Sequence, residues 1–179
     1  MSTLFAKAAA LVVAGAFGLT GCAGSTTPTP TPSPTVIIPA SSTPSLTESQ
    51  KAANDTVIKY RALIDELRQQ ETPDTARVAT IARASAYENV LSTLIDDFRN
   101  GHRQVGVSIL TILSTDPGVG SGEWKVTGCL DLSKVDILDK SGKSIRTDTQ
   151  NRYLSTFTVD QDPQNHSWYV MSDEANGTC

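Results

Sequence analysis

Few residues of this 179-residue chain have the type and spacing that catalysis requires. The two histidines, His102 and His166, each lie beside a predicted turn, and neither has a partner at the spacing of a metal site or a catalytic triad. Six aspartates fall at predicted strand ends and turns, where such side chains commonly accept backbone N–H groups: Asp131, Asp136, Asp139, Asp148, Asp160 and Asp162. We therefore predict no catalytic residue, no metal site and no cofactor.

One catalytic alternative stays open. An aspartate in an apolar cavity loses hydration, and this raises its pKa toward the range of a general base. Such an aspartate could lie in the interior beside Tyr60, Tyr87 or Tyr153, and the sequence does not select it. An open apolar pocket that holds an Asp–Tyr or Asp–His pair would favour an enzyme over a non-catalytic domain.

The start of the chain carries a different kind of signal. An apolar run follows the single cation Lys7 and ends at Leu19-Thr20-Gly21-Cys22. The run has the length of a signal-peptide core and is shorter than the roughly 20 residues of a membrane-spanning helix. These last four residues resemble the lipobox of bacterial lipoproteins. The resemblance implies acylation of the Cys22 sulfur and cleavage before Cys22, whereas the alternative is an ordinary secreted protein cut near Ala23.

The segment after Cys22 is rich in Thr, Ser and Pro and holds six of the nine prolines. Such a sequence cannot pack a core, and in an extended polyproline conformation it would span roughly 70 Å. We therefore expect a signal peptide at 1–21, a lipidated stalk at 22–45 and one domain at 46–179. Residues 1–21 contain one cation and no acid, so the formal charge of −4 becomes −5 after cleavage. This charge and the lack of a basic cluster argue against a nucleic-acid partner.

The two remaining cysteines, Cys129 and Cys179, form a natural pair once Cys22 is used for lipid. Outside the cytosol a disulfide between them can persist. We predict that they are bonded, with two unrelated thiols as the alternative.

Residues 46–100 follow the period of helices. Overlapping capping boxes start at Ser45 and Thr47 and predict a helix over 46–70. Its apolar stripe is Ala53, Val57, Tyr60, Ile64 and Leu67, with Lys59, Arg61, Asp65 and Arg68 outside it. A short second helix is predicted from Pro73, capped by Thr72, and a third over 85–100 that ends at Gly101. The third has its apolar face at Tyr87, Leu91, Leu94 and Phe98. One continuous helix over 73–100 is the alternative.

After Gly101 the period changes to two, which is typical of strands. Residues 105–113 are apolar on both faces and are predicted to form a central strand. Further strands are expected at 123–131, 134–139, 152–160 and 168–171. Helices followed by strands predict an α+β fold, with three N-terminal helices packed on a curved antiparallel sheet of four or more strands.

This order, with Trp124-x-Val126 and Trp168-Tyr169-Val170 in the strands, resembles the NTF2-like (cystatin-like cone) domains of small actinobacterial or actinophage lipoproteins with Thr/Pro stalks. The chain departs from the common plan because no strand is predicted between the second and third helices. The resemblance implies a pocket between helices and sheet, which binds ligands in some members and catalyses reactions in others.

Together these features predict a lipoprotein that displays a non-catalytic binding domain on the extracytoplasmic face of the plasma membrane. Its expected partners are the lipid bilayer, through Cys22, and an envelope protein or a small ligand. An NTF2-like isomerase or dehydratase and a phage superinfection-exclusion lipoprotein are the alternatives.

Overall fold

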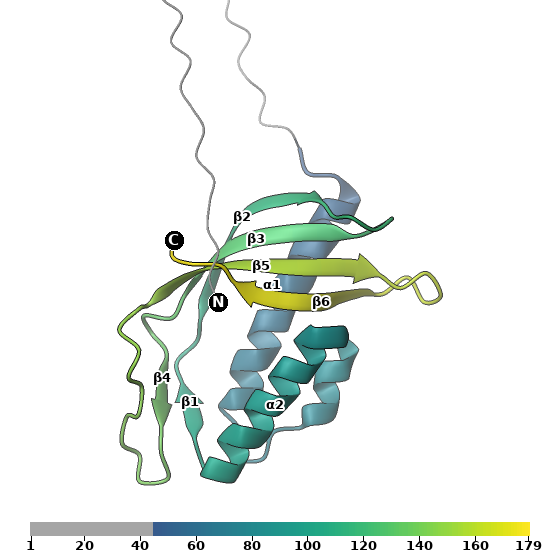
Figure 1. Ribbon diagram of the computed structural model, residues 1–179. Coiled ribbons are helices and arrows are strands. Elements are labelled where there is room, and N and C mark those ends of the chain that lie inside the picture. Colours follow the sequence, from purple (N-terminus) through teal and green to yellow (C-terminus); the bar gives the residue numbers. More distant parts are fainter. Residues whose placement is uncertain (1–44) are drawn as a thin grey trace, which may run out of the picture. The chain divides into compact units, whose positions relative to one another are not determined.

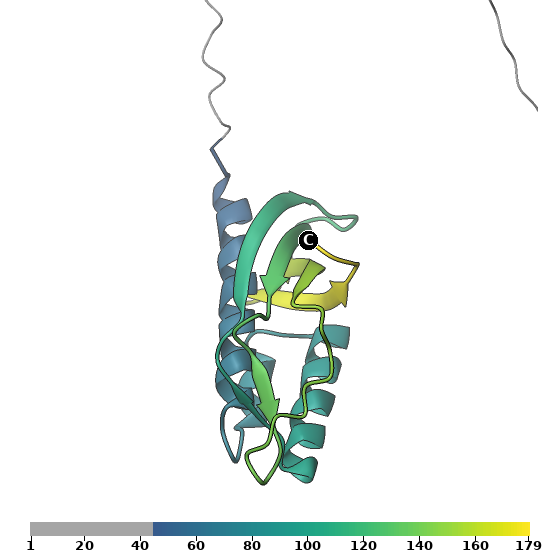
Figure 2. The ribbon, with the colours of Figure 1, turned by 90° about the vertical axis from the view of Figure 1, so that its left-hand side faces the viewer.

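Helices precede all strands in the part of the chain that the computed structural model describes, residues 45–179 (Figure 1). The elements are α1 (Glu48–Arg68), the 3₁₀ helix η1 (Thr75–Thr80), α2 (Ala84–Asn100), β1 (Arg103–Val105), β2 (Ile109–Pro117), β3 (Trp124–Asp131), β4 (Asp136–Leu138), β5 (Arg152–Gln161) and β6 (Trp168–Ala175). The predicted α+β class, with N-terminal helices on a curved antiparallel sheet of four strands, is confirmed (Figure 2). The predicted signal peptide, Cys22 and the stalk up to residue 44 lie outside the described residues.

Helix α1 begins where the second capping box predicts. The Thr47 hydroxyl accepts from the Gln50 backbone N–H at 3.2 Å, and the Gln50 side chain accepts from the Thr47 N–H at 2.8 Å. Every residue of the predicted apolar stripe is buried, which confirms the phase of this helix. Asp65, predicted to lie outside the core, is buried as well. Its burial is explained below by the hydrogen bonds that its carboxylate accepts.

The predicted second helix is a 3₁₀ helix, and its N-cap is Asp74 rather than Thr72. The chain then leaves helical geometry, because Ala82 forms an isolated parallel bridge with Val170 of β6. The Val170 N–H donates to the Ile81 carbonyl and its carbonyl accepts from the Arg83 N–H, both at 2.9 Å. One continuous helix over 73–100 is therefore wrong, and the described chain has only this one bridge between the second and third helices, where no strand was predicted.

Helix α2 has the predicted extent and ends at Gly101 in the left-handed conformation, as predicted. Its buried face, however, consists of Ala86, Val90 and Leu94. The predicted face was shifted by one residue over most of the helix, and Phe98 is 56% exposed. The shift arises because the long apolar side chains, and not the small Ala86, were taken to mark the core.

The predicted central strand over 105–113 is wrong in two respects. It is divided into β1 and β2, and β2 lies at the edge of the sheet, whose order is β2-β3-β5-β6. Gly106 makes the division with a φ of +79°, and a Cβ there would lie 1.8 Å from the Lys134 carbonyl oxygen. Leu110 and Ile112 pack against the core, whereas Ile109 and Leu113 on the other face remain on the surface, 45% and 55% exposed. Strand β1 instead pairs with β4 in a separate two-stranded sheet.

The core lies between the helices and one face of the four-stranded sheet. Helix α1 crosses the sheet, and α2 lies below β6 (Figure 1). Phe157 of β5 and Tyr60 of α1 meet edge to face at the centre, with ring centroids 6.3 Å apart. Both side chains are at most 1% exposed, and burial of each aromatic ring stabilises the fold by about 2–3 kcal/mol.

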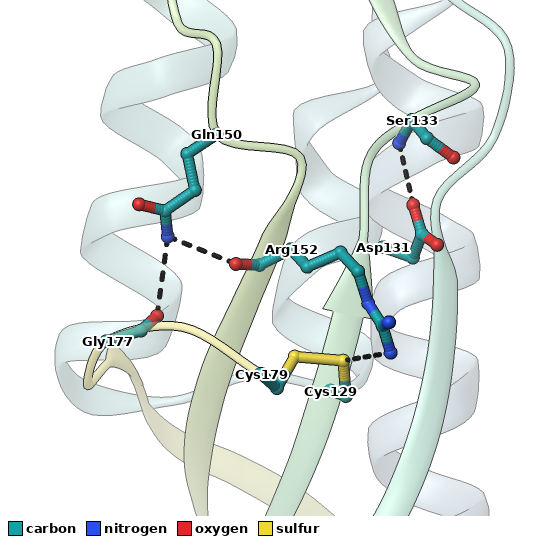
Figure 3. The surroundings of a disulfide bond; sticks show 7 residues. All are labelled: Cys129, Asp131, Ser133, Gln150, Arg152, Gly177 and Cys179. Atoms are coloured by element: carbon teal, nitrogen blue, oxygen red, sulfur yellow. Dashed lines mark hydrogen bonds between the residues drawn. A yellow bond between two sulfur atoms is a disulfide. The ribbon is translucent and has the colours of Figure 1, made fainter.

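The predicted disulfide between Cys129 and Cys179 is present and joins the C-terminal tail to β3 (Figure 3). The tail also follows β5, because the Leu154 N–H donates to the Gly177 carbonyl at 3.0 Å and the Asn176 N–H donates to the Leu154 carbonyl at 2.7 Å. The covalent bond and these hydrogen bonds hold the last residues against the sheet.

Candidate binding site between α1, α2 and β6

A pocket of about 170 Å³ opens between α1, α2 and the end of β6. Three aliphatic residues and six polar or aromatic ones line it: Ile64, Val90 and Leu94, and Tyr60, Arg61, Arg68, Asn89, Thr93 and Asp173. The lining of the pocket therefore combines aliphatic groups with hydrogen-bonding groups.

The periodicity of the elements brings these residues together. On each helix the lining residues recur at intervals of about one turn, so that they share a face. Asp173 comes from β6, where it stands opposite Phe157 in the register with β5 and so lies on the face of the sheet that the helices cover. Side chains that are 112 positions apart, such as Arg61 and Asp173, consequently meet at one site.

An ion pair joins Arg61 and Asp173 in the lining of the pocket. The Arg61 Nη1 atom lies 3.5 Å from Asp173 Oδ2, and the two side chains are only 16% and 21% exposed. The Arg61 Nε atom is also buried, and it has no hydrogen-bond partner among the described residues. Arg68, in contrast, is well paired, because its Nε donates to Asp97 Oδ2 at 2.8 Å.

Burial sets the ionisation of the neighbouring acid groups. Loss of hydration raises the pKa of Asp173, and the Arg61 charge offsets only part of this rise. Burial and the negative charge of Asp173 raise the pKa of Tyr60, so its hydroxyl stays protonated. The pocket thus holds a neutral tyrosine and a carboxyl that takes up a proton more readily than an exposed aspartate.

Sequence reasoning named Tyr60 as a possible partner of an interior aspartate but did not find Asp173. The last strand was predicted to end at Met171, whereas β6 continues to Ala175. The polar run Ser172-Asp173-Glu174 resembles a strand end, and only the alternation of faces beyond Met171 could have indicated an inward Asp173.

The six aspartates predicted at turns lie outside this pocket. Each accepts a backbone N–H within its own turn or strand end, as predicted for aspartates in turns: Asp131, Asp136, Asp139, Asp148, Asp160 and Asp162. Of the other two tyrosines named as possible partners of an interior aspartate, Tyr87 packs against the core and Tyr153 donates to the Asp148 carboxylate.

The histidines also lie away from the pocket. His102 Nδ1 is 3.9 Å from Asp97 Oδ1, and His166 is exposed in the turn between β5 and β6. Among residues 45–179, no group of three or more His, Cys, Asp or Glu side chains is arranged to hold a metal ion. No helix in the same range is long and apolar enough to cross a membrane.

A second buried carboxylate, Asp65, serves a different purpose. It accepts hydrogen bonds from Gln104 Nε2 at 2.8 Å and from both the backbone N–H and the hydroxyl of Ser108 at 2.7 Å. These bonds fasten the connection between β1 and β2 to α1. Because both carboxylate oxygens are occupied by the fold, Asp65 is a structural residue.

Comparison with known proteins shows the fold only. No known family and no curated protein matches the sequence. The intermembrane-space region of the chloroplast protein ARC6 aligns at a TM-score of 0.60 with 12% identity, over 75% of this chain and 100% of that region. An NTF2-like protein of unknown function from Exiguobacterium sp. 255-15 aligns at 0.38 with 10% identity, over 69% of this chain and 99% of that protein. The latter score is too low to support an argument. The domain itself is an α+β domain with its helices on a four-stranded antiparallel sheet, and it shares this fold with the ARC6 region.

Proposed function

We propose that this protein is a membrane-anchored lipoprotein whose NTF2-like domain binds a ligand or envelope partner outside the plasma membrane without converting it chemically. The observation that supports binding is the pocket between α1, α2 and β6. Its lining includes the guanidinium of Arg61, whose buried Nε has no hydrogen-bond partner among the described residues, together with the Asn89 and Thr93 side chains. Its carboxylate, Asp173, is already held by Arg61. These hydrogen-bonding side chains can recognise a polar ligand.

The anchor in this proposal comes from the sequence. A lipidated Cys22 would hold the chain firmly, since each buried methylene of an acyl chain contributes about 0.8 kcal/mol. A stalk that keeps the domain near the surface would raise the local concentration of the domain for any partner there. Metabolic labelling with a clickable palmitate should mark the wild type and leave Cys22→Ala unlabelled. Equal labelling of both would contradict the anchor.

Binding at the pocket can be tested with neighbouring substitutions on α2. Both Asn89 and the adjacent Glu88 are exposed, but only Asn89 lines the pocket. A small-metabolite screen by ligand-observed NMR, on the full chain in detergent micelles, should find ligands that Asn89→Trp no longer binds and Glu88→Trp still binds. Ligands that bind both variants equally would place the site elsewhere.

A second function, catalysis of the isomerase or dehydratase kind, is favoured by the Asp173–Tyr60 pair. Asp173 could act as a general base and the protonated Tyr60 hydroxyl as a hydrogen-bond donor to a developing oxyanion. The site differs from the apolar pocket expected of such an enzyme, because two arginines line it. Saturable turnover by the wild type, with a loss of about 100-fold or more in Asp173→Asn, would replace the binding proposal with this one.

A further inference from the structure

We propose that the ligand of this pocket is a small monocarboxylic acid, whose carboxylate accepts hydrogen bonds from Arg61 and whose short apolar tail lies against Ile64, Val90 and Leu94. This inference rests on the proposed binding function and names its ligand class.

The donor that selects the ligand is the Arg61 guanidinium. Its Nε is the one buried side-chain nitrogen or oxygen without a hydrogen-bond partner among residues 45–179. A buried donor without an acceptor is costly, and an anionic oxygen is the acceptor that forms the strongest bond to it. A carboxylate also matches the planar edge of a guanidinium, because its two oxygens can accept from two N–H groups at once.

The charges in the pocket favour a monoanion. Arg68 is compensated by Asp97 at 2.8 Å, whereas Arg61 is only loosely compensated by Asp173 at 3.5 Å. While Asp173 is ionised it balances Arg61, so the pocket can attract one negative charge once Asp173 is protonated, and a dianion would leave a charge unpaired. The Asp173 carboxyl, whose pKa burial raises, can take up a proton and then donate to the bound carboxylate instead of repelling it.

The volume of the pocket and its aliphatic lining limit the size of the ligand's tail. A cavity of about 150 Å³ holds one benzene molecule, so the 170 Å³ here accommodates a ligand of roughly that size. Ile64, Val90 and Leu94 are each no more than 7% exposed and provide an apolar surface. Butyrate, valerate and benzoate meet these conditions.

The test measures binding of butyrate, valerate and benzoate to the full chain in detergent micelles by calorimetry, with butyramide and butylamine as neutral and cationic controls. At pH 7 at least one acid should bind 10-fold or more tightly than either control and shift the amide resonances of Asn89 and Thr93. Arg61→Gln should lose that selectivity. Arg99→Gln removes an exposed arginine of α2 that does not line the pocket and should keep it.

Two further variants distinguish the loss of a ligand contact from a loss of folding. Arg61→Lys keeps the charge but lacks Nε, so it should fold and still bind the acid at least 3-fold more weakly. Asp173→Asn removes the competing negative charge and should bind the acid more tightly than the wild type at pH 7. Weaker binding by Asp173→Asn, or unchanged binding by Arg61→Lys, would contradict the assigned contacts.

The outcomes separate this inference from the one on which it rests. If butyramide or another uncharged compound shifts Asn89 and Thr93 as strongly as the acids, the pocket binds ligands but the carboxylate class is wrong. If no acid and no compound of the metabolite screen shifts these resonances, both proposals are overturned.

Discussion

Asp65 is a buried carboxylate whose contribution lies in the groups that it satisfies. Replacing it with alanine would leave the Gln104 amide and the Ser108 backbone N–H without their acceptor. Hydrogen bonds to a charged group contribute about 1.5–3 kcal/mol each, so Asp65→Ala should lower the free energy of unfolding by about 3 kcal/mol or more. Urea denaturation measures this change. Asp55→Ala, on the exposed side of the same helix, should change it by less than about 0.5 kcal/mol. Equal decreases in the free energy of unfolding for Asp65→Ala and Asp55→Ala would contradict the structural role of Asp65.

Asp173 should make stability depend on pH in the direction opposite to that of an ordinary ion-paired aspartate. Its pKa in the folded state is raised, so the folded state binds the proton more tightly than the unfolded state. The stability contributed by this proton is present at low pH and is lost as pH rises through the folded-state pKa. The side chain at position 173 does not titrate in Asp173→Asn. The free energy of unfolding of this variant minus that of the wild type should therefore be larger at pH 8 than at pH 4. Urea midpoints at both pH values test this. A relative stability that falls between pH 4 and pH 8 would show that the Arg61 ion pair outweighs burial.

At the scale of single residues, the sequence predicted interactions between chain neighbours better than contacts between residues far apart in the chain. The turn aspartates were correctly interpreted because an aspartate and the N–H that it binds are neighbours in the chain. The charged residues Arg61 and Asp65 were placed outside the core because their burial depends on partners at positions 173, 104 and 108, which no helical period reveals. The pocket could not be assembled from the sequence for the same reason.

The break between β1 and β2 depends on Gly106. Gly106 and Gly142 have nearly equal φ values of +79° and +80°, but a Cβ at position 142 meets nothing within 4 Å. Alanine at either position has the strain of a left-handed backbone, about 1–3 kcal/mol. Gly106→Ala must also displace the Lys134 backbone, so we expect it to lose at least about 2 kcal/mol more than Gly142→Ala in thermal or urea unfolding. Similar losses would show that the β1–β2 connection can shift without cost.

Elements with strong local signals were predicted almost to the residue. The capping box at Thr47, the left-handed Gly101 and the alternation in β3 and β5 each act over a few residues. The position of β2 at the edge was not predictable from such signals. Apolar residues on both faces of a strand usually indicate a central position, yet here Ile109 and Leu113 remain exposed.

The disulfide should stabilise the domain mainly by restricting the conformations of the unfolded chain. In the loop-entropy model, a bridge across a sequence separation of 50 contributes about 4 kcal/mol. Non-reducing peptide mass spectrometry should find the cross-linked pair. Cys179→Ser and reduced wild type should show equal decreases in melting temperature, and full alkylation of Cys129 and Cys179 without reduction would refute the bridge.

At the scale of the whole molecule, the stalk is expected to provide reach. Deleting residues 23–44 while keeping Cys22 should reduce capture of a large envelope partner on intact cells and leave binding of small ligands at the pocket unchanged. Flow cytometry with a domain-specific antibody would measure accessibility, and a scrambled stalk of equal length is the control. If residues 46–179 alone restored full function, anchor and reach would both be irrelevant, and the enzyme would become the better proposal.

The pocket and the core both join the first helix to the last strand, and this fixes when the domain can be completed during synthesis. Helix α1 emerges from the ribosome first among the described elements, but Asp173 and Val170 of β6 follow more than 100 residues later. At 5–20 residues per second, the stripe of α1 stays without its final cover for several seconds or longer. A chain interrupted before β6 would lack the partners of Arg61 and Ala82 together. The native cover of this apolar stripe can begin with the earlier elements, such as Phe157 of β5, but it is completed only when the last strand has been made.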